Sequence, residues 1–457
     1  MKNRIAYLSL GCDKNRVDTE RTLAALARSG FEPVESPAAA AALFINTCGF
    51  IEPAKSESIE AVLAGVRAKQ AGDYQKLVVA GCLVERYRKE LARELPEVDL
   101  WLGLEHTEEL PGLLPGVLGR KEQSGAAGKR RRAPAGSRFL TTPPHYSFLK
   151  VAEGCNAACR FCAIPRIRGR LRSESLDSLI DEALELERSG VKELNLVAQD
   201  TTAYGRDLKP RLELADLVEA LLAKTRIPWI RILYAHPAHV SDRLIELLAH
   251  EDRLLRYLDL PLQHISDKML KLMGRAPGRR GTMMLLDRLQ DSIPELALRT
   301  SFLVGHPGES EEDFAELLAF IEEGRFLWAS GFVFSAEEGT RSAKLSGRVE
   351  REEAERRLFA LLEAQEEITG SRLSGYAGRE LTLLVDGPWR EFVESEEPVQ
   401  RDGRGSGGGA DSSWCARFCG QAVEVDGAVR LVGRARPGLF VRALILDYHG
   451  FDLEATC

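Results

Sequence analysis

Six segments of strand character alternate with amphipathic helical patterns through the middle of this 457-residue chain. The strands are expected at residues 148–153, 193–199, 229–235, 257–263, 299–305 and 331–335. The helices that separate them include residues 175–189, 212–224, 242–249 and 311–323. Because strand–helix repeats fold as parallel sheets with right-handed crossovers, this order predicts an open, partial TIM-like (β/α)6 barrel. Such a barrel has its site at the carboxyl ends of the strands, and its lateral opening suits a large substrate.

Three cysteines follow the first of these strands within eight residues. Cys155, Cys159 and Cys162 have the spacing C-x3-C-x2-C, which allows three thiolates to hold three corners of a cubane iron–sulfur cluster with one iron open. A closed zinc site needs a fourth ligand, but the next histidine downstream is the distant His236 and His145 lies across the expected strand. A chance grouping is the simpler alternative, and the rarity of cysteine disfavours it.

A second set of cysteines, Cys12, Cys48 and Cys82, ends three short apolar runs in the first third of the chain. Their spacings of 36 and 34 residues each suit one βαβ unit. We expect helices between the runs at residues 18–28, 56–69 and 85–94, the first of them capped by Asp18. Parallel strands would bring the three cysteines to one sheet edge, where they could hold a second iron–sulfur cluster. Small buried residues at strand ends are the alternative, reasonable for one cysteine and weak for all three.

Composition separates the remaining parts of the chain. A stretch rich in Gly, Ala and basic residues predicts a flexible linker, and a long charged helix is expected at about 350–371. After it, the apolar period changes to two, with Gly-rich turns, which predicts a small antiparallel β-barrel. The chain is therefore predicted to be an α/β multidomain protein, with an open α/β sheet domain at 1–118, a linker at 119–142, the barrel core at 143–371, the β-barrel at 372–449 and a tail at 450–457.

Composition also excludes some classes of protein. No apolar run approaches the roughly 18 residues that a membrane span requires, and the first residues lack the apolar core of a signal peptide. We therefore expect a cytoplasmic protein without membrane contact, whose nine cysteines serve metal or redox chemistry and not disulfides. The net charge of −7 argues against direct nucleic-acid binding as the dominant interaction.

The two cysteine sets, in this order and followed by a small β-barrel, resemble the methylthiotransferase family of radical S-adenosylmethionine (SAM) enzymes over nearly the whole chain. The segments that carry the resemblance are residues 10–15, 46–51, 80–82, 153–169 and, for the TRAM domain of the family, 373–449. Residues 198–205, 257–266 and 273–275 are similar to the branch that modifies an aspartate of a small-subunit ribosomal protein. The other branch modifies an adenosine in transfer RNA. His306 and Ser310 stand where the family usually has Phe and Thr, but neither is a ligand position.

The resemblance implies a transferase that replaces a C–H bond at the β-carbon of the aspartate by a methylthio group. No side-chain base removes such a proton, so a radical route is required. The family uses two 4Fe-4S clusters and two SAM molecules, with no catalytic side chain beyond the clusters. One cluster, on Cys155, Cys159 and Cys162, would generate the radical, and an electron donor such as a flavodoxin or ferredoxin would reduce it. The other cluster, on the earlier three cysteines, would present the sulfur.

SAM needs polar anchors at the strand ends. We predict them at Gln199, Asp200, Gly305, Pro307 and Glu309, although a polar residue in such a position is as often a cap of the next helix. Three histidines at strand ends are expected to be structural, and three late cysteines to be ordinary thiols. These are His236, His264, His306, Cys415, Cys419 and Cys457.

Charge gives a separate indication of the substrate. Residues 374–450 contain nine basic and eleven acidic side chains, a net charge of −2, whereas a barrel that binds RNA needs a basic face. A basic ribosomal protein suits this surface better, and Glu394, Glu396 and Glu397 are predicted substrate contacts unless they are simply a solvated loop. Two rivals are a transfer-RNA methylthiotransferase and a non-catalytic metal-binding RNA adaptor. The adaptor needs neither two open cysteine sites nor a six-unit barrel.

Overall fold

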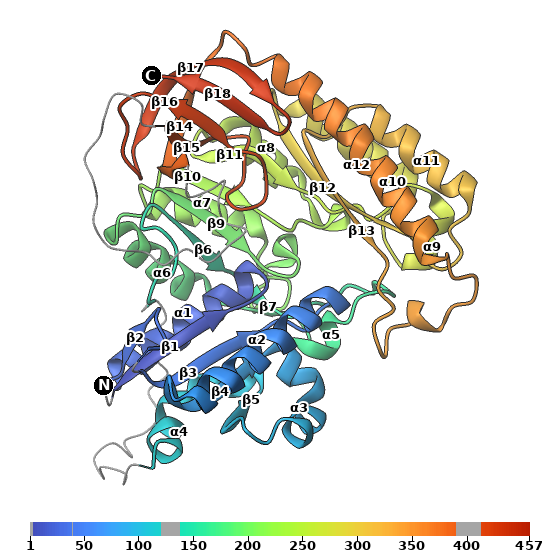
Figure 1. Cartoon of the computed structure of the whole chain (residues 1–457). Coiled ribbons are helices and arrows are strands. Elements are labelled where there is room, and N and C mark those ends of the chain that lie inside the picture. The colour runs from blue at the N-terminus through green and yellow to red at the C-terminus, as the bar shows by residue number, and fades with distance from the viewer. Residues whose placement is uncertain (1–2, 39, 120–137, 390–412) are drawn as a thin grey trace.

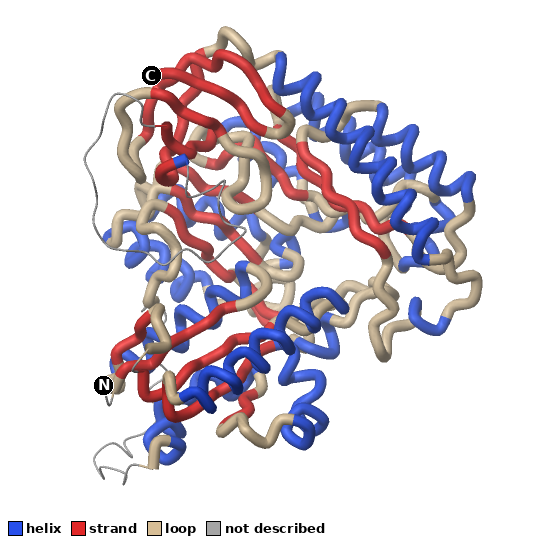
Figure 2. The backbone as a smooth tube through the Cα atoms, viewed as in Figure 1, coloured by secondary structure: helices blue, strands red, loops and turns tan. Residues whose placement is uncertain are grey.

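A computed structural model describes residues 3–38, 40–119, 138–389 and 413–457 of the chain, which form three domains in sequence order (Figure 1). The strands form three main groups, one for each domain (Figure 2). The predicted contacts Glu394, Glu396 and Glu397, and most of the predicted linker, lie outside the described residues. Within the described part of the chain, no helix has both the length and the apolarity to cross a bilayer.

The N-terminal domain is built on a five-stranded parallel sheet with the order β2-β1-β3-β4-β5. The three predicted strands that end at cysteines are β1, β3 and β4, and two short strands that we did not predict flank them. The elements of this domain are β1 (Arg4–Ser9), α1 (Asp13–Arg28), β2 (Glu32–Val34), β3 (Ala40–Thr47), α2 (Glu52–Ala71), β4 (Tyr74–Gly81), α3 (Cys82–Glu94), β5 (Leu100–Leu102), η1 (Leu104–Glu109) and α4 (Leu110–Val117).

The first helix begins five residues earlier than predicted, so the assignment of Asp18 as its cap was wrong. Gly11, with φ of 85°, turns the chain directly from β1 into α1, and Cys12 is the N-cap residue. The carbonyl of Cys12 accepts the first helical hydrogen bonds, from the backbone N–H groups of Asn15 and Arg16. Asp18 instead lies inside the helix, where its carboxylate is available to the core domain.

The core domain has the six parallel strands that the sequence predicts, in the order β13-β12-β11-β10-β9-β6. The sheet follows chain order without closing, as expected for a partial barrel. Its strands are β6 (Tyr146–Lys150), β9 (Glu193–Val197), β10 (Trp229–Ile232), β11 (Leu254–Asp259), β12 (Ala297–Val304) and β13 (Trp328–Val333). Its helices are α6 (Leu176–Arg188), α7 (Leu214–Lys224), α8 (Asp242–His250), α9 (Asp267–Met273), α10 (Gly278–Ser292), α11 (Glu311–Glu322) and α12 (Arg351–Ser374). Short elements complete it: β7 (Ala152–Glu153), α5 (Ile164–Ile167), β8 (Arg172–Ser173), η2 (Thr201–Ala203), η3 (Pro237–His239) and η4 (Ser342–Lys344).

The two faces of the core sheet pack against different partners, because successive side chains of a strand point to opposite sides. Ile230 and Ile232 of β10 belong to the apolar core shared with the surrounding helices. Trp229, on the other face, belongs to a second apolar cluster with Val17 of α1 and Phe418 of the C-terminal barrel. The N-terminal helix and the C-terminal domain therefore both cover one face of the core sheet.

The C-terminal domain is a closed five-stranded barrel of β14 (Glu380–Pro388), β15 (Ser413–Phe418), β16 (Val429–Val432), β18 (Asp452–Thr456) and β17 (Phe440–His449). Four of the five strand pairs are antiparallel, and β16–β18 is parallel. The predicted tail at 450–457 is wrong, because it contains β18. Gly450 has φ of 60°, which lets the chain reverse after β17, and Leu453 and Ala455 then point into the barrel.

One carboxylate joins all three domains. Glu424, in the loop between β15 and β16, accepts two hydrogen bonds of 2.7 Å from the guanidinium of Arg16 on α1. It also accepts a hydrogen bond of 2.7 Å from the hydroxyl of Tyr146 on β6. The first helix is thus anchored to the last domain at the surface of the core sheet.

Candidate active site

Cys12, Cys48 and Cys82 lie at the carboxyl edge of the N-terminal sheet, as their spacing predicts. Cys12 follows β1, Cys48 follows β3, and Cys82 is the first residue of α3 directly after β4. Burial raises the pKa of the Cys82 thiol to about 12, and the neighbouring Cys12 and Cys48 add to that rise. The three sulfurs are therefore close enough to influence one another. Cys48 and Cys82 are buried, whereas Cys12 is exposed.

The backbone around this triad fits closely. A Cβ at Gly11 would lie 2.7 Å from the Cβ of Cys48 and 2.9 Å from its sulfur, so the loop needs glycine there for space as well as for its positive φ. Ser58 of α2 fixes the next loop: its hydroxyl donates to the Cys48 carbonyl at 2.8 Å and accepts from the Cys48 N–H at 2.9 Å. Asn15 donates to the carbonyls of Leu10 and Thr47 and so ties the first two loops together.

Two helices begin at this triad with their N-termini toward it. Cys12 is the N-cap of α1 and Cys82 is the first residue of α3. A helix N-terminus carries a partial positive charge and unpaired N–H groups, which stabilise thiolates and other anions. The position of these cysteines thus favours the charged form that binds metal, although burial alone disfavours it.

Cys155, Cys159 and Cys162 occupy the loop after β7. The Cys155 N–H donates to the Gly169 carbonyl at 3.1 Å, and the Cys162 N–H donates to the Cys159 carbonyl at 3.4 Å, which folds the loop back on itself. Burial raises the pKa of Cys162 to about 12, with further contributions from Cys159 and Cys155. A Cβ at Gly154 would lie 2.2 Å from the Arg170 carbonyl oxygen, so the chain passes itself closely just before the motif.

The segment 273–275 braces this second loop, a contact that the sequence did not reveal. The backbone N–H of Arg160 donates to the Met273 carbonyl at 2.8 Å. A Cβ at Gly274 would lie 2.7 Å from the Ala158 carbonyl oxygen. The guanidinium of Arg275 donates to the sulfur of Cys159 at 3.5 Å. A cation is therefore held beside the thiols of the core triad.

The donor set of each triad fits a multi-iron cluster better than a single ion. Asp200, His236 and His239 are the one group of three His, Cys, Asp or Glu residues in the described ranges whose ligand atoms all lie within 4.8 Å of one another. The sulfurs of neither triad are that close, whereas the sulfurs around a tetrahedral zinc lie about 3.8 Å apart, given a Zn–S bond of about 2.3 Å. Three thiols with wider spacing and no fourth protein ligand fit a cubane with one open iron.

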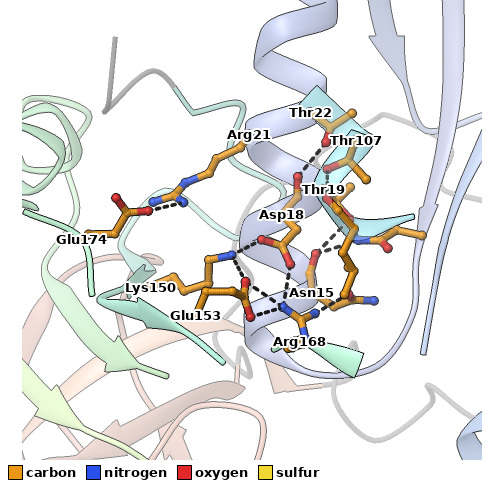
Figure 3. A network of polar contacts seen from close by, with 12 residues as sticks. Asn15, Asp18, Thr19, Arg21, Thr22, Thr107, Lys150, Glu153, Arg168 and Glu174 are labelled. Carbon is orange, nitrogen blue, oxygen red and sulfur yellow. Dashed lines mark hydrogen bonds and ion pairs between the residues drawn. The ribbon is translucent and has the colours of Figure 1, made fainter. Parts of the chain in front are cut away.

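The N-terminal triad contacts the segment that follows the core motif, where the N-terminal and core domains meet. Cys82 packs in a small apolar cluster with Ala163 and Ile167, which follow the core motif directly. Next to them the buried guanidinium of Arg168 donates to Asn15 Oδ1 at 2.9 Å and to Asp18 Oδ2 at 3.0 Å (Figure 3). The sequence predicted each triad separately but gave no signal for this contact.

Tyr234 forms a second link between the domains. It follows β10 and has φ of 59°, a conformation that costs energy for a bulky residue and is typical of functional sites. Its hydroxyl donates to Asp13 Oδ2 at 2.8 Å, next to Cys12, and the ammonium of Lys14 lies 3.2 Å from the ring centroid. Sequence patterns do not report backbone strain, so Tyr234 was missed.

Two predicted SAM anchors lie beside the core triad. The side-chain amide of Gln199 donates to Glu153 at 3.2 Å, and its oxygen is buried without a hydrogen-bond partner in the described part of the chain. Asp200 caps η2 by accepting from the Ala203 N–H at 3.1 Å, and it also accepts from Thr202. Gln199 thus keeps an acceptor for a ligand, whereas the capping role that we weighed for Asp200 is observed.

The other three predicted anchors are held within their own loop. Glu309 accepts hydrogen bonds from the Gly305 N–H at 2.5 Å and from Arg357 at 3.0 Å. The Pro307 carbonyl lies 2.9 Å from the Nδ1 of His306. These contacts shape the loop after β12, and a role for Gly305, Pro307 or Glu309 in binding SAM stays a prediction.

Comparison with known proteins defines the class. The model of the Radical SAM superfamily matches residues 149–321, and that of the Uncharacterized protein family UPF0004 matches residues 4–103. A solved structure of the radical SAM methyltransferase TsrM from Kitasatospora setae superposes with a TM-score of 0.52 at 14% identity, over 72% of each chain, which shows a shared fold. The chain is therefore a radical SAM protein, a class that uses an iron–sulfur cluster and SAM.

Its relatives define the family within that class. The chain is 43% identical to the ribosomal protein uS12 methylthiotransferase RimO of Syntrophomonas wolfei, over 80% of this chain and 83% of that protein. It is 41% identical to the protein of the same name from Anaeromyxobacter sp. strain K, over 99% and 93%. The chain belongs to the RimO family of methylthiotransferases and is a transferase.

Proposed function

We propose that this protein transfers a methylthio group to the β-carbon of an aspartate in ribosomal protein uS12, with two 4Fe-4S clusters and two SAM molecules. The relatives named above support the substrate. The observation that carries the proposal is the packing of Cys82 against Ala163 and Ile167, since it brings the N-terminal three-cysteine site to the segment that directly follows the core motif.

The two triads would hold the two clusters. When bound, a cluster at Cys155, Cys159 and Cys162 supplies the electron that cleaves SAM, and a cluster at the N-terminal triad supplies sulfur. The chain links the N-terminal and core domains beside these cysteines through the hydrogen bonds of Arg168 and Tyr234. Close and fixed placement is the main contribution that a protein can make to a radical transfer.

The three cysteines of the N-terminal triad differ in burial, and this difference affects how a substrate would reach a cluster bound there. Cys48 and Cys82 are buried, the latter packed against Ala163 and Ile167 of the core domain, while Cys12 is exposed. The open iron of a cluster there is therefore expected to be reached from the side of Cys12. Gln199, with its free amide oxygen beside Glu153, is the best-placed of the predicted anchors for SAM at the core triad.

The reaction itself tests the proposal. Reconstituted enzyme, SAM and a reductant such as reduced flavodoxin or ferredoxin are incubated with small ribosomal subunits or with transfer RNA, and both products are weighed by mass spectrometry. We expect methylthiolation of an aspartate in uS12 and none in transfer RNA. Modification of transfer RNA alone would overturn the assignment of uS12 as the substrate. Cleavage of SAM without methylthio transfer to uS12 or to transfer RNA would overturn the assignment of the N-terminal triad as the sulfur site.

A further inference from the structure

Arg168 follows the core cysteine motif and hydrogen-bonds to residues that support both cysteine triads, Asn15 in the N-terminal domain and Glu153 in the core domain. We propose that Arg168 sets the reduction potential of the cluster assigned to Cys12, Cys48 and Cys82, by holding a buried positive charge beside Cys82. The inference rests on the proposed function, because it requires a cluster at the N-terminal triad. Arg168 is a positioning residue, which acts through the field at the ligands and through the placement of their loops.

The guanidinium of Arg168 bonds to both sides of the domain contact (Figure 3). Nη2 donates to Oδ1 of Asn15 at 2.9 Å, and Asn15 ties together the loops of the N-terminal triad. Nη1 donates to the carboxylate of Glu153 at 2.9 and 3.0 Å, two residues before Cys155. One side chain is therefore hydrogen-bonded to the supports of both triads.

Arg168 is also close to a sulfur of the N-terminal triad. Asn15 Oδ1, which accepts from Arg168, is also 3.9 Å from the sulfur of Cys82. Ile167, the residue before Arg168, packs against Cys82. Because the side chain of Arg168 is only 1% exposed, solvent screens its charge little.

The charges around Arg168 balance only while it is cationic. Arg168 and Lys150 carry two positive charges, and Asp18 and Glu153, which both contact them, carry two negative charges. A neutral residue at 168 leaves one partly buried negative charge of Asp18 and Glu153 without compensation. Reduction of a cluster adds negative charge, so that excess disfavours the reduced form and lowers the potential.

Arg138 provides a matched control. It is similarly buried, with a side chain 2% exposed, and it also joins the two domains through ion pairs with Glu20 of α1 and Glu182 of α6. It donates in addition to the Phe148 carbonyl at 3.1 Å. None of these partners is adjacent to a cysteine, so loss of Arg138 weakens the domain contact without changing the charge beside Cys82.

The test isolates the N-terminal cluster in the full-length chain. Cys155, Cys159 and Cys162 are replaced by Ala, the protein is reconstituted anaerobically, and the remaining cluster is titrated with its electron paramagnetic resonance signal as the readout. In this background Arg168→Gln is expected to shift the reduction equilibrium at least tenfold toward the oxidised form, about 59 mV more negative for one electron. Arg168→Lys keeps the positive charge, so its potential is expected to stay close to the parental value. Arg138→Gln is expected to leave the potential unchanged.

A second variant is expected to shift the reduction potential in the opposite direction. Asp18→Asn removes a negative partner of Arg168 and is expected to move the potential to more positive values. If Arg168→Gln does not fold, the sign of the Asp18→Asn shift decides the question, and an unchanged potential in that variant overturns the proposal. An unchanged potential in folded Arg168→Gln with four irons bound overturns it as well, while the two-cluster function stands. Absence of iron from the triple cysteine variant itself would instead contradict that function.

Discussion

Single residues decide how closely the cysteine loops can pack. Gly11 lies against Cys48 with no space for a side chain, and the hydroxyl of Ser58 holds the backbone of Cys48 from the other side. Tyr234 has a strained backbone conformation, and its hydroxyl donates a hydrogen bond to Asp13, next to Cys12. At this scale the site is a set of close contacts whose tolerance is a few tenths of an ångström.

Replacement of Gly11 by Ala tests this tolerance. The new Cβ would lie 2.7 Å from the Cβ of Cys48 and would also occupy a left-handed conformation, which costs roughly 1–2 kcal/mol for a non-glycine residue. We expect the variant to lose the N-terminal cluster and keep the core one, so that bound iron falls to about half. Gly72→Ala is the control, since φ is 92° there but no atom lies within 4 Å of the added Cβ. An equal loss of iron in both variants would mean that backbone strain alone is responsible.

His236 is expected to make stability depend on pH. Burial, with a further contribution from Arg275, lowers its pKa from 6.5 to about 3. Between these values the unfolded chain binds a proton that the folded chain does not, so stability is highest above pH 6.5 and falls as the pH is lowered toward 3. At pH 5.5 the loss amounts to about 1.4 kcal/mol.

In the parent protein the Ala238 N–H donates a hydrogen bond of 3.1 Å to the Nδ1 of His236. The variant His236→Asn keeps an acceptor for this hydrogen bond, but its side chain does not titrate. Thermal unfolding at pH 7.5 and 5.5 should therefore show a smaller difference for this variant than for the parent. His250→Asn, at an exposed position of α8, should retain the parental difference. If the difference in thermal unfolding between pH 7.5 and 5.5 is the same in all three proteins, the lowered pKa of His236 is contradicted.

Sequence reasoning found the site residues with distinctive chemistry and missed those that act through position. Six cysteines are visible because cysteine is rare and its spacing has chemical meaning. Arg168 and Arg275 are two of many arginines, and only the fold shows that each lies near a sulfur. Asp200 and Glu309 are engaged in a cap and in loop contacts, and their roles in binding SAM stay predictions.

At the scale of elements, the N-terminal site consists of strand-to-helix transitions. Strands β1 and β4 pass directly into α1 and α3 at a cysteine, and β3 reaches α2 after a short loop. The existence and type of the main elements followed from periodicity, because strong patterns report which face is buried. Helix starts were less predictable: the polar Asp18 looked like a cap, while the actual start depends on the turn at Gly11.

Strand β18 allows a test at this scale. It pairs with both β16 and β17, and Leu453 and Ala455 are fully covered inside the barrel. Removal of residues 450–457 opens the barrel, exposes two strand edges and leaves a cavity. We expect a loss of at least about 3 kcal/mol in unfolding free energy, measured by denaturant titration. Removal of the exposed Cys457 alone is the control, and a parental stability for the longer deletion would show that the barrel does not need its last strand.

At the scale of the whole molecule, the core sheet presents one face to helices and the other to the flanking domains. The contact between the N-terminal and core domains combines apolar packing with buried ion pairs, in which Arg168 and Arg138 each join α1 to the core. Hydrophobic patterning predicted the three domains, but their docking also uses charge pairs between α1 and segments more than 100 residues away. Such pairs leave no local signature in a sequence.

At this scale we predict that the two triads hold separate clusters with different roles. Full anaerobic reconstitution should load about eight irons per chain. With Cys12, Cys48 and Cys82 replaced by Ala, iron should fall to about half, SAM should still be cleaved and no methylthio product should form. Iron content, SAM cleavage products and the mass of uS12 are measured on the same preparation. Methylthiolated uS12 from this variant would show that sulfur comes from elsewhere.

The contact of Arg16 with Glu424 has a consequence for biosynthesis. Arg16, on the helix that follows Cys12, is synthesised 408 residues before its partner Glu424. Until then α1 lacks both that carboxylate and the apolar cover that Phe418 supplies next to Val17. The first domain can therefore reach its final position only after the loop that contains Glu424 has been synthesised.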